Sequence, residues 1–124
     1  MGKPDLEFQR DWAALQTALE KQFGEPPELE AILLLVGIQE IGKGPMRLNK
    51  RQKMDALHVA ICSLLIPYEY YRFVGRDEDG WPHFEATEHL PGLKPIQQQR
   101  LIKEALIDYF SPLETAFSKE IKKD

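Results

Sequence analysis

Apolar residues near the start of the chain recur at helical spacing. Successive members of the set are four, three, four and four residues apart, which places them on one face of a helix. The set comprises Phe8, Trp12, Leu15, Leu19 and Phe23. Gly24 follows, and glycine can adopt the left-handed conformation that closes a helix. The pattern predicts an amphipathic helix over residues 4–23.

The next segment is apolar on every side rather than on one face. Ala31–Ile38 carries no polar side chain, as in a helix buried at the centre of a protein. Pro26–Pro27 suits the first turn of this helix, and Gly42 ends it. Gly37 inside the helix lowers stability relative to alanine, which a close contact with a second helix would explain. We expect a buried helix over residues 27–41.

A third helix is predicted over residues 49–66. The Asn49 side chain can accept a hydrogen bond from a free backbone amide of the first turn. Gln52, three residues later, can complete a capping box. Pro67 ends the helix, because the residue before a proline avoids helical geometry.

Aromatic residues then predict a β-hairpin over residues 68–87. Tyr68–Val74 and Trp81–Thr87 have extended character, and the residues between them favour a turn. A four-residue loop at Asp77–Gly80 pairs Phe73 with Phe84, an aromatic contact on one face. A cross-strand ion pair is expected on the other face in the same register.

That ion pair joins Arg72 to Glu85. An isolated hairpin is marginally stable in water, so we expect this one to pack on the helices or on a partner.

The C-terminal part of the chain favours two further helices. Apolar residues recur every four positions towards Phe110, which predicts a helix over residues 95–110. Ser111 and Pro112 have the pattern of a new helix start, so a short last helix is predicted over residues 112–122. Its apolar face would contain Leu113, Phe117 and Ile121.

Together these elements predict a predominantly helical α+β fold, with four or five helices and one β-hairpin between the third and fourth. A length of 124 residues suits one domain, and we expect a single domain over residues 1–124. Hydrophobic residues at 43% and charged residues at 29% are typical of a globular protein.

Composition and charge exclude several classes of protein. A single cysteine excludes a disulfide framework and a multi-cysteine zinc site. The net charge of −4 argues against a dedicated nucleic-acid binder. Neither a secretory signal nor an apolar run long enough to span a bilayer is visible. We therefore expect a cytoplasmic protein with no membrane association.

Polar residues on the third helix form the first candidate site. Asp55, His58 and Cys62 are three and four residues apart, so they share one helix face. Antiparallel packing of the second and third helices would bring Glu40 near them. The alternative is structural: a solvated Asp55, a His58 hydrogen-bonded at the core edge, and Cys62 as a small apolar filler.

Acidic and histidine side chains of the hairpin would approach the same place. Carboxylates and imidazoles can hold a divalent metal, or act as a base and its orienting acid. A divalent metal is therefore the candidate cofactor, against the alternative of an ordinary solvated turn. The candidate ligands are Glu40, Asp55, His58, Asp77, Asp79 and His83.

A basic segment before and within the start of the third helix is the candidate anion site. Cations oppose the dipole at a helix N-terminus, and a bound phosphate would remove that conflict. The alternative is a solvated loop. The residues concerned are Lys43, Arg47, Lys50 and Arg51.

Aromatic residues of the hairpin are the candidate interaction surface. Tyrosine and tryptophan are enriched in the cores of interfaces, although they are equally common in ordinary strands. The candidates are Tyr68, Tyr70, Tyr71 and Trp81.

Three stretches resemble a family of small bacterial proteins of unknown function: PPELEAILLLVGIQEIGKG, KRQKMDALHVAIC and YEYYRFVGRDEDGWPHFE. The resemblance covers residues 26–110. It implies a single domain, and it carries no activity or catalytic residue to this chain.

Because no complete catalytic constellation is visible, we expect a non-enzymatic interaction or accessory protein that binds a protein partner or forms a homodimer. The alternative is a metal- or anion-dependent enzyme or ligand-binding protein with its site around Glu40, Asp55 and His58. The alternative requires these groups and those of the hairpin in one concave pocket. The first interpretation predicts a packed and hydrogen-bonded His58, with Asp77 and Asp79 in solvent.

Overall fold

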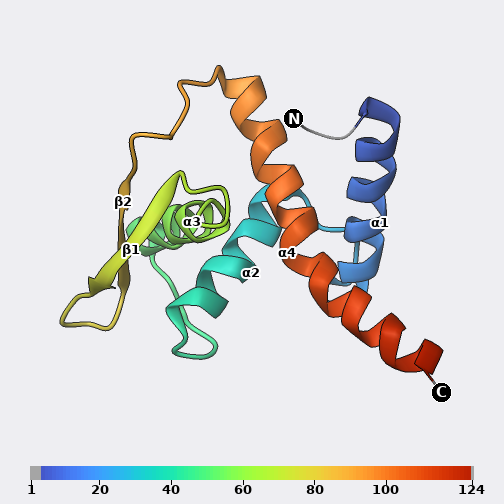
Figure 1. The fold of residues 1–124 in the computed structure, drawn as a ribbon. Coiled ribbons are helices and arrows are strands. Elements are labelled where there is room, and N and C mark those ends of the chain that lie inside the picture. The colour runs from blue at the N-terminus through green and yellow to red at the C-terminus, as the bar shows by residue number, and fades with distance from the viewer. Residues whose placement is uncertain (1–3, 124) are drawn as a thin grey trace. The chain divides into compact units, whose positions relative to one another are not determined.

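Over the residues that the structure describes, the fold consists of four helices and one two-stranded antiparallel sheet (Figure 1). The computed structural model describes residues 4–123, with side chains described as far as residue 111. This confirms the predominantly helical α+β fold, with the hairpin between the third and fourth helices. In chain order the elements are α1 (Asp5–Phe23), α2 (Leu29–Ile41), α3 (Lys50–Leu64), β1 (Tyr71–Arg76), β2 (Pro82–Ala86) and α4 (Pro95–Lys123).

The chain divides into two compact units. One contains α1 and α4, and the other is the continuous segment Glu28–Lys94, with α2, α3 and the hairpin. In the first unit the Arg100 guanidinium lies 4.1 Å from the centre of the Phe8 ring, a cation–π contact between α4 and α1. The single domain expected from the sequence stays a prediction.

Glycine ends both of the first two helices, as the sequence predicts. Gly24 and Gly42 have φ angles of 82° and 79°, in the left-handed region. The predicted start of α2 at the prolines is wrong, because Glu28 is extended with ψ of 170° and acts as the N-cap. Pro27 stays outside the helix, where its carbonyl oxygen accepts a hydrogen bond of 2.9 Å from Gln16 Nε2.

The predicted capping box of α3 is confirmed. The Gln52 backbone amide lies 2.8 Å from Asn49 Oδ1, and the Asn49 amide lies 3.0 Å from Gln52 Oε1. At the other end α3 stops at Leu64, two residues before the predicted end. Glu69, in the turn that follows, has a φ of 65°, which a continuing helix would not allow.

The close helix contact expected at Gly37 is also confirmed. A Cβ atom built on Gly37 would lie 2.2 Å from the backbone oxygen of Ala56. Since heavy atoms do not approach so closely, only glycine permits this packing of α2 on α3.

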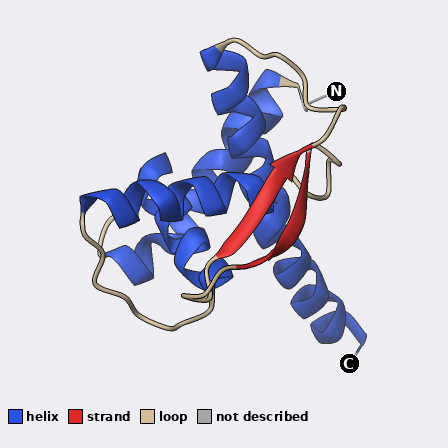
Figure 2. Cartoon of the chain, turned by 90° about the vertical axis from the view of Figure 1, so that its left-hand side faces the viewer, coloured by secondary structure: helices blue, strands red, loops and turns tan. Residues whose placement is uncertain are grey.

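Figure 2 shows the two strands of the hairpin side by side. Near its open end the hairpin has the predicted register. Phe73 pairs with Phe84, and their ring centres are 6.0 Å apart in an edge-on arrangement. Arg72 pairs with Glu85 and forms an ion pair with it. Both predicted pairs are therefore confirmed.

Towards the turn, the register shifts by one residue. Gly75 lies opposite His83, which leaves an extra residue in β1 as a β-bulge. The φ of 126° at Gly75 is accessible to glycine and disfavoured for other residues. The loop between the strand ends therefore runs over residues 77–81, one residue longer than the predicted loop.

The hairpin packs on α3, as its marginal stability in isolation requires (Figure 1). Ile41, Ala56 and Val59 form a buried cluster in this unit. Trp81 and Phe84 of the hairpin pack against this cluster from one side. The aromatic residues thus attach the strand β2 and the turn before it to the helices.

Helix α4 is continuous through Pro112, so the separate last helix predicted over residues 112–122 is wrong. Proline removes one backbone hydrogen bond, but its fixed φ is compatible with a helix, so the chain can continue. The predicted apolar face of that helix lies outside the described side chains. No helix in the described range has the length and apolar character needed to cross a membrane.

Candidate functional site

The turn between the strands is organised by the Asp77 side chain. Its Oδ1 atom accepts hydrogen bonds of 2.9 Å from the Asp79 amide and 3.0 Å from the Trp81 amide. The Gly80 amide donates to the Asp77 backbone oxygen at 2.9 Å. Aspartate is favoured in turns because its short side chain bonds to the backbone just ahead in this way.

Arg76 joins this turn to the end of α2. Its guanidinium donates hydrogen bonds to the backbone oxygens of Ile41 at 2.8 Å, Gly80 at 2.6 Å and Glu40 at 3.1 Å. Helix α2 has no basic residue in its last turn, and its terminal carbonyls lack partners within the helix. Arg76 supplies both the missing donors and the positive charge.

This role of Arg76 is not predicted by the residues around it in the sequence. The sequence does show that the last turn of α2 lacks a basic residue. It does not show which residue supplies the missing charge, because Arg76 lies 35 residues further along the chain than Ile41.

Lys43, from the loop between α2 and α3, also reaches the turn. Its Nζ atom donates a hydrogen bond to the backbone oxygen of Asp79. A Cβ atom on Gly80 would lie 3.0 Å from Lys43 Cε. The position of the turn is therefore fixed by two cations that contact its backbone.

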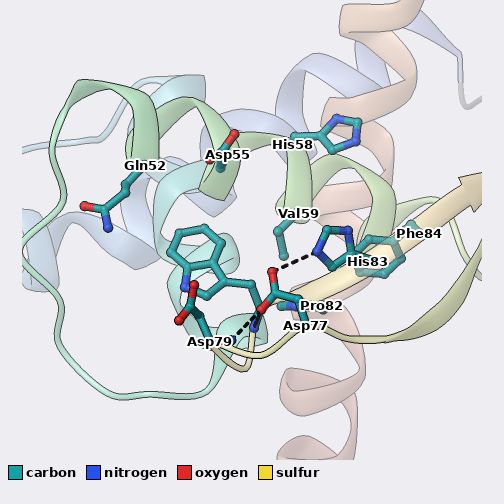
Figure 3. A pocket seen from close by; sticks show the side chains of 10 residues that line it. Gln52, Asp55, His58, Val59, Asp77, Asp79, Pro82, His83 and Phe84 are labelled. Atoms are coloured by element: carbon teal, nitrogen blue, oxygen red, sulfur yellow. Dashed lines mark hydrogen bonds and ion pairs between the residues drawn. The ribbon is translucent and has the colours of Figure 1, made fainter.

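Between α3 and the hairpin lies an open pocket of about 330 Å³ (Figure 3). Helix α3 contributes one wall, and the turn and β2 contribute the other. The lining residues are Gln52, Asp55, His58, Val59, Asp77, Asp79, Trp81, Pro82, His83 and Phe84.

His83 and Asp77 are joined by a hydrogen bond within this pocket (Figure 3). His83 Nε2 lies 2.9 Å from Asp77 Oδ2, and the two side chains are 60% and 40% exposed. The hydrogen bond from His83, followed by that from the Trp81 amide, lowers the pKa of Asp77 below its ordinary value of 3.8. Asp77 is therefore a carboxylate throughout the neutral pH range.

His58 contacts a buried thiol at the inner side of α3. Its Nε2 atom lies 3.4 Å from Cys62 Sγ, in a hydrogen bond between residues one helical turn apart. Cys62 is fully buried, and burial raises the pKa of its thiol to about 11. Because the thiolate is the reactive form, Cys62 is suited to packing rather than to nucleophilic chemistry.

Two further carboxylates in the pocket are unpaired. Asp55 comes from α3 and Asp79 from the turn, and both side chains are exposed (Figure 3). Within the described part of the chain, neither carboxylate makes a hydrogen bond or an ion pair. They differ in this respect from Asp77, whose two oxygens are both occupied.

The structure brings five of the six candidate metal ligands to this one pocket. Glu40 is the exception: it lies half-buried in the last turn of α2 and does not line the pocket. No three His, Cys, Asp or Glu side chains among the described residues lie close enough together to hold a metal ion. His58 is hydrogen-bonded, and Asp77 and Asp79 are exposed, as the interaction hypothesis predicts, but His58 is itself exposed, so the predicted packing of its side chain is wrong.

Two contacts at the candidate anion site are already occupied by groups of the chain itself. Lys43 is directed to the turn, and the Asn49 side chain already caps the Gln52 amide. All four residues of the set, Lys43, Arg47, Lys50 and Arg51, are exposed. These are the features of a solvated segment, and anion binding stays a prediction.

The four aromatic candidates for an interaction surface are half-buried. The rings of Tyr68 and Tyr70 lie 5.7 Å apart and contact each other, and Trp81 packs on the cluster of Ile41, Ala56 and Val59. Tyr71 is also only partly accessible.

The large apolar side chains that the hairpin does expose are Phe73 and Val74, at 52% and 51%. They adjoin the bulge.

The chain matches no protein-family model, no curated protein and no solved structure.

Proposed function

We propose that this protein is a binding module that receives a cationic side chain of a partner protein in the pocket between α3 and the hairpin. The observation that carries the proposal is the pair of unpaired carboxylates, Asp55 and Asp79, in one pocket. The chain is then an interaction protein, as the sequence favours, and the pocket is its recognition site.

The composition of the pocket wall favours an organic cation. Beside the carboxylates the pocket is lined by Trp81 and Phe84, together with Val59 and Pro82. Arginine and lysine combine a charged head with an aliphatic stem that packs on apolar surface. Tryptophan also attracts a guanidinium or ammonium group through its ring face. An arginine side chain matches both parts of the wall.

The polar residues of the pocket differ in their availability. Both carboxylate oxygens of Asp77 already accept hydrogen bonds, from the turn and from His83. Asp77 therefore contributes to cation binding only through the long-range attraction of its negative charge. Asp55 and Asp79 have oxygens free to accept hydrogen bonds from a ligand. Charge-assisted hydrogen bonds of this kind are shorter and stronger than neutral ones.

The first test is a titration followed by two-dimensional ¹⁵N NMR. The probe is N-acetyl-arginine methylamide, and its matched control is the uncharged citrulline compound. We expect the arginine compound to shift the signals of the Trp81 indole and the Asp79 amide, and the citrulline compound to leave them in place. Equal shifts with both compounds would contradict cation binding.

Two substitutions then test the site. Asp55→Asn and Asp79→Asn should each weaken arginine binding about tenfold, or about 1.4 kcal/mol, as expected for one charge-assisted hydrogen bond. Glu78→Gln is the matched control, because it removes the same charge from the same turn at an exposed residue outside the pocket. An equal loss in Glu78→Gln would mean that the probe senses only the overall charge of the turn.

A peptide series identifies the occupant. Peptides with one arginine in a neutral background should bind more tightly than the free arginine compound, since a partner segment adds contacts with the pocket rim. If the free compound binds as tightly as every peptide, the pocket takes a small-molecule cation instead of a protein side chain.

A further inference from the structure

We propose that Gln52 determines the specificity of this pocket: its side-chain amide donates a hydrogen bond to a peptide carbonyl of the ligand whose guanidinium binds the carboxylates. The inference rests on the proposed cation-binding function and names the class of ligand that the pocket prefers. That class is an arginine within a peptide chain, in preference to a small guanidinium compound.

The capping box at the start of α3 fixes the orientation of the Gln52 side chain. Its Oε1 atom accepts a hydrogen bond of 3.0 Å from the Asn49 backbone amide. A backbone amide can only donate, so the atom that faces Asn49 is the oxygen, and the amide nitrogen lies on the other side of the group. A solvated glutamine can exchange these two atoms by turning, but Gln52 cannot do so without breaking the capping box.

The amide nitrogen of Gln52 is a donor at the wall of the pocket. The side chain is half-buried and lines the pocket. Within the described part of the chain, its nitrogen makes no hydrogen bond. This nitrogen carries two N–H groups and cannot accept a hydrogen bond. The group that suits it is therefore an oxygen atom of the ligand.

The position of Gln52 matches the distance between the two ends of an arginine residue. Gln52 and Asp55 are three residues apart, which places their Cβ atoms about 5–6 Å from each other on the helix surface. Three methylene groups separate the guanidinium of an arginine from its backbone. A ligand whose guanidinium binds Asp55 therefore has its backbone carbonyl within reach of the adjacent turn of α3.

Of the two turns of α3 beside Asp55, the one with Gln52 offers this donor. Figure 3 shows Gln52, Asp55 and His58 in this order along the helix. His58 lies at the other end, and its Nε2 atom contacts Cys62. The backbone of the ligand is therefore expected to lie over the first turn of α3.

The experiment compares two ligands by NMR titration of ¹⁵N-labelled protein. N-acetyl-arginine methylamide carries two peptide carbonyls, and n-butylguanidinium has the same guanidinium and stem without them. We expect the arginine compound to bind about fivefold more tightly, as for one hydrogen bond between neutral groups. Equal dissociation constants for the two ligands would overturn the inference without the use of any variant.

Gln52→Glu then tests the residue itself. Glutamate also completes a capping box, so the start of α3 is kept, but its carboxylate has no proton to donate. The advantage of the arginine compound should fall from about fivefold to less than about twofold. The added charge attracts both cations alike, so the ratio of the two dissociation constants reports the contact with the carbonyl.

Met54→Glu is the matched control for the added charge. It places a carboxylate on the same helix, at a side chain that is 65% exposed and does not line the pocket. This variant should keep the ratio of the unsubstituted protein. An equal fall of the ratio in Gln52→Glu and Met54→Glu would overturn the role of Gln52.

The outcomes separate this inference from the proposed function. Binding of both ligands with equal strength would overturn the role of Gln52 and leave cation binding intact. No binding of either ligand would overturn both. A preference for the arginine compound that is lost in Gln52→Glu and kept in Met54→Glu supports both.

Discussion

At the scale of single residues, Gly37 shows how one missing side chain determines the packing of two helices. The backbones of α2 and α3 approach so closely that a Cβ atom would lie 2.2 Å from a backbone oxygen and 2.9 Å from a backbone carbon of Ala56. A rotamer change cannot relieve such a contact, because both opposing atoms belong to the main chain.

Gly37→Ala should therefore lower the free energy of unfolding by about 2 kcal/mol, the usual cost of an overpacked core, in spite of the better helix propensity of alanine. Urea unfolding followed by circular dichroism measures the change. Gly92→Ala is the matched control, because a Cβ atom there meets nothing within 4 Å. Equal stability of Gly37→Ala and Gly92→Ala would show that the helices lie further apart.

The single cysteine illustrates the opposite case, a side chain whose volume fills the core. Cys62 is fully buried, its thiol contacts His58, and its pKa is raised to about 11. Asp55 and His58 share its helix face by spacing, yet only these two reach the pocket. Spacing along the helix does not distinguish Cys62 from Asp55 and His58, but burial does, because Cys62 is in the core and the other two line the pocket.

At the scale of elements, Arg76 connects a strand to a helix end. Helix α2 ends in carbonyl groups that no local side chain satisfies, and the guanidinium of Arg76 bonds two of them together with one from the turn. The pocket depends on this link, because the turn carries two of its aspartates.

Arg76→Met should lower the free energy of unfolding by about 1–2 kcal/mol, since it removes hydrogen bonds from a charged donor to the α2 carbonyls. It should also weaken arginine binding by displacing the turn. Arg72→Met is the matched control on the same strand, because Arg72 pairs with Glu85 where both side chains are exposed. Such surface pairs contribute at most about 1 kcal/mol, and often nothing measurable.

Chemical unfolding of both variants decides between a structural link and a surface contact. If Arg76→Met is no less stable than Arg72→Met, the hydrogen bonds to α2 contribute nothing net to folding.

At the scale of the whole molecule, the stability of the fold should respond to acid through Asp77. Its folded-state pKa lies below the ordinary value of 3.8, so the unfolded chain binds a proton more readily than the folded one. The stabilisation is therefore fully present above pH 4 and is lost as the pH falls through the lowered folded value.

The difference in unfolding free energy between the unsubstituted protein and Asp77→Asn should accordingly shrink as the pH is lowered from 6 to 2. Urea unfolding at pH 6, 4, 3 and 2 measures it. Glu78→Gln should show no comparable trend, since the Glu78 carboxylate makes no hydrogen bond in the described structure. A constant difference for Asp77→Asn would mean that its hydrogen bonds do not distinguish the folded from the unfolded chain.

The amino-acid sequence determined most of the elements and the pairing at the open end of the hairpin, because the causes are local. The capping box of Asn49 and Gln52, the stop at Gly24 and the contact of Phe73 with Phe84 depend on residues close in the chain or across one turn. The local sequence was misleading at Ser111 and Pro112, which have the pattern of a helix start although α4 continues through them.

Tertiary structure alone decided which polar residues meet. Glu40 and Ile41 are neighbours, but successive residues of a helix point about 100° apart. Ile41 faces the buried cluster, and the Glu40 side chain is consequently not in the pocket. Arg76 reaches α2 across 35 residues, and the bulge before it sets where the turn lies. Contacts between distant segments depend on how buried faces pack together, which no single stretch of sequence encodes.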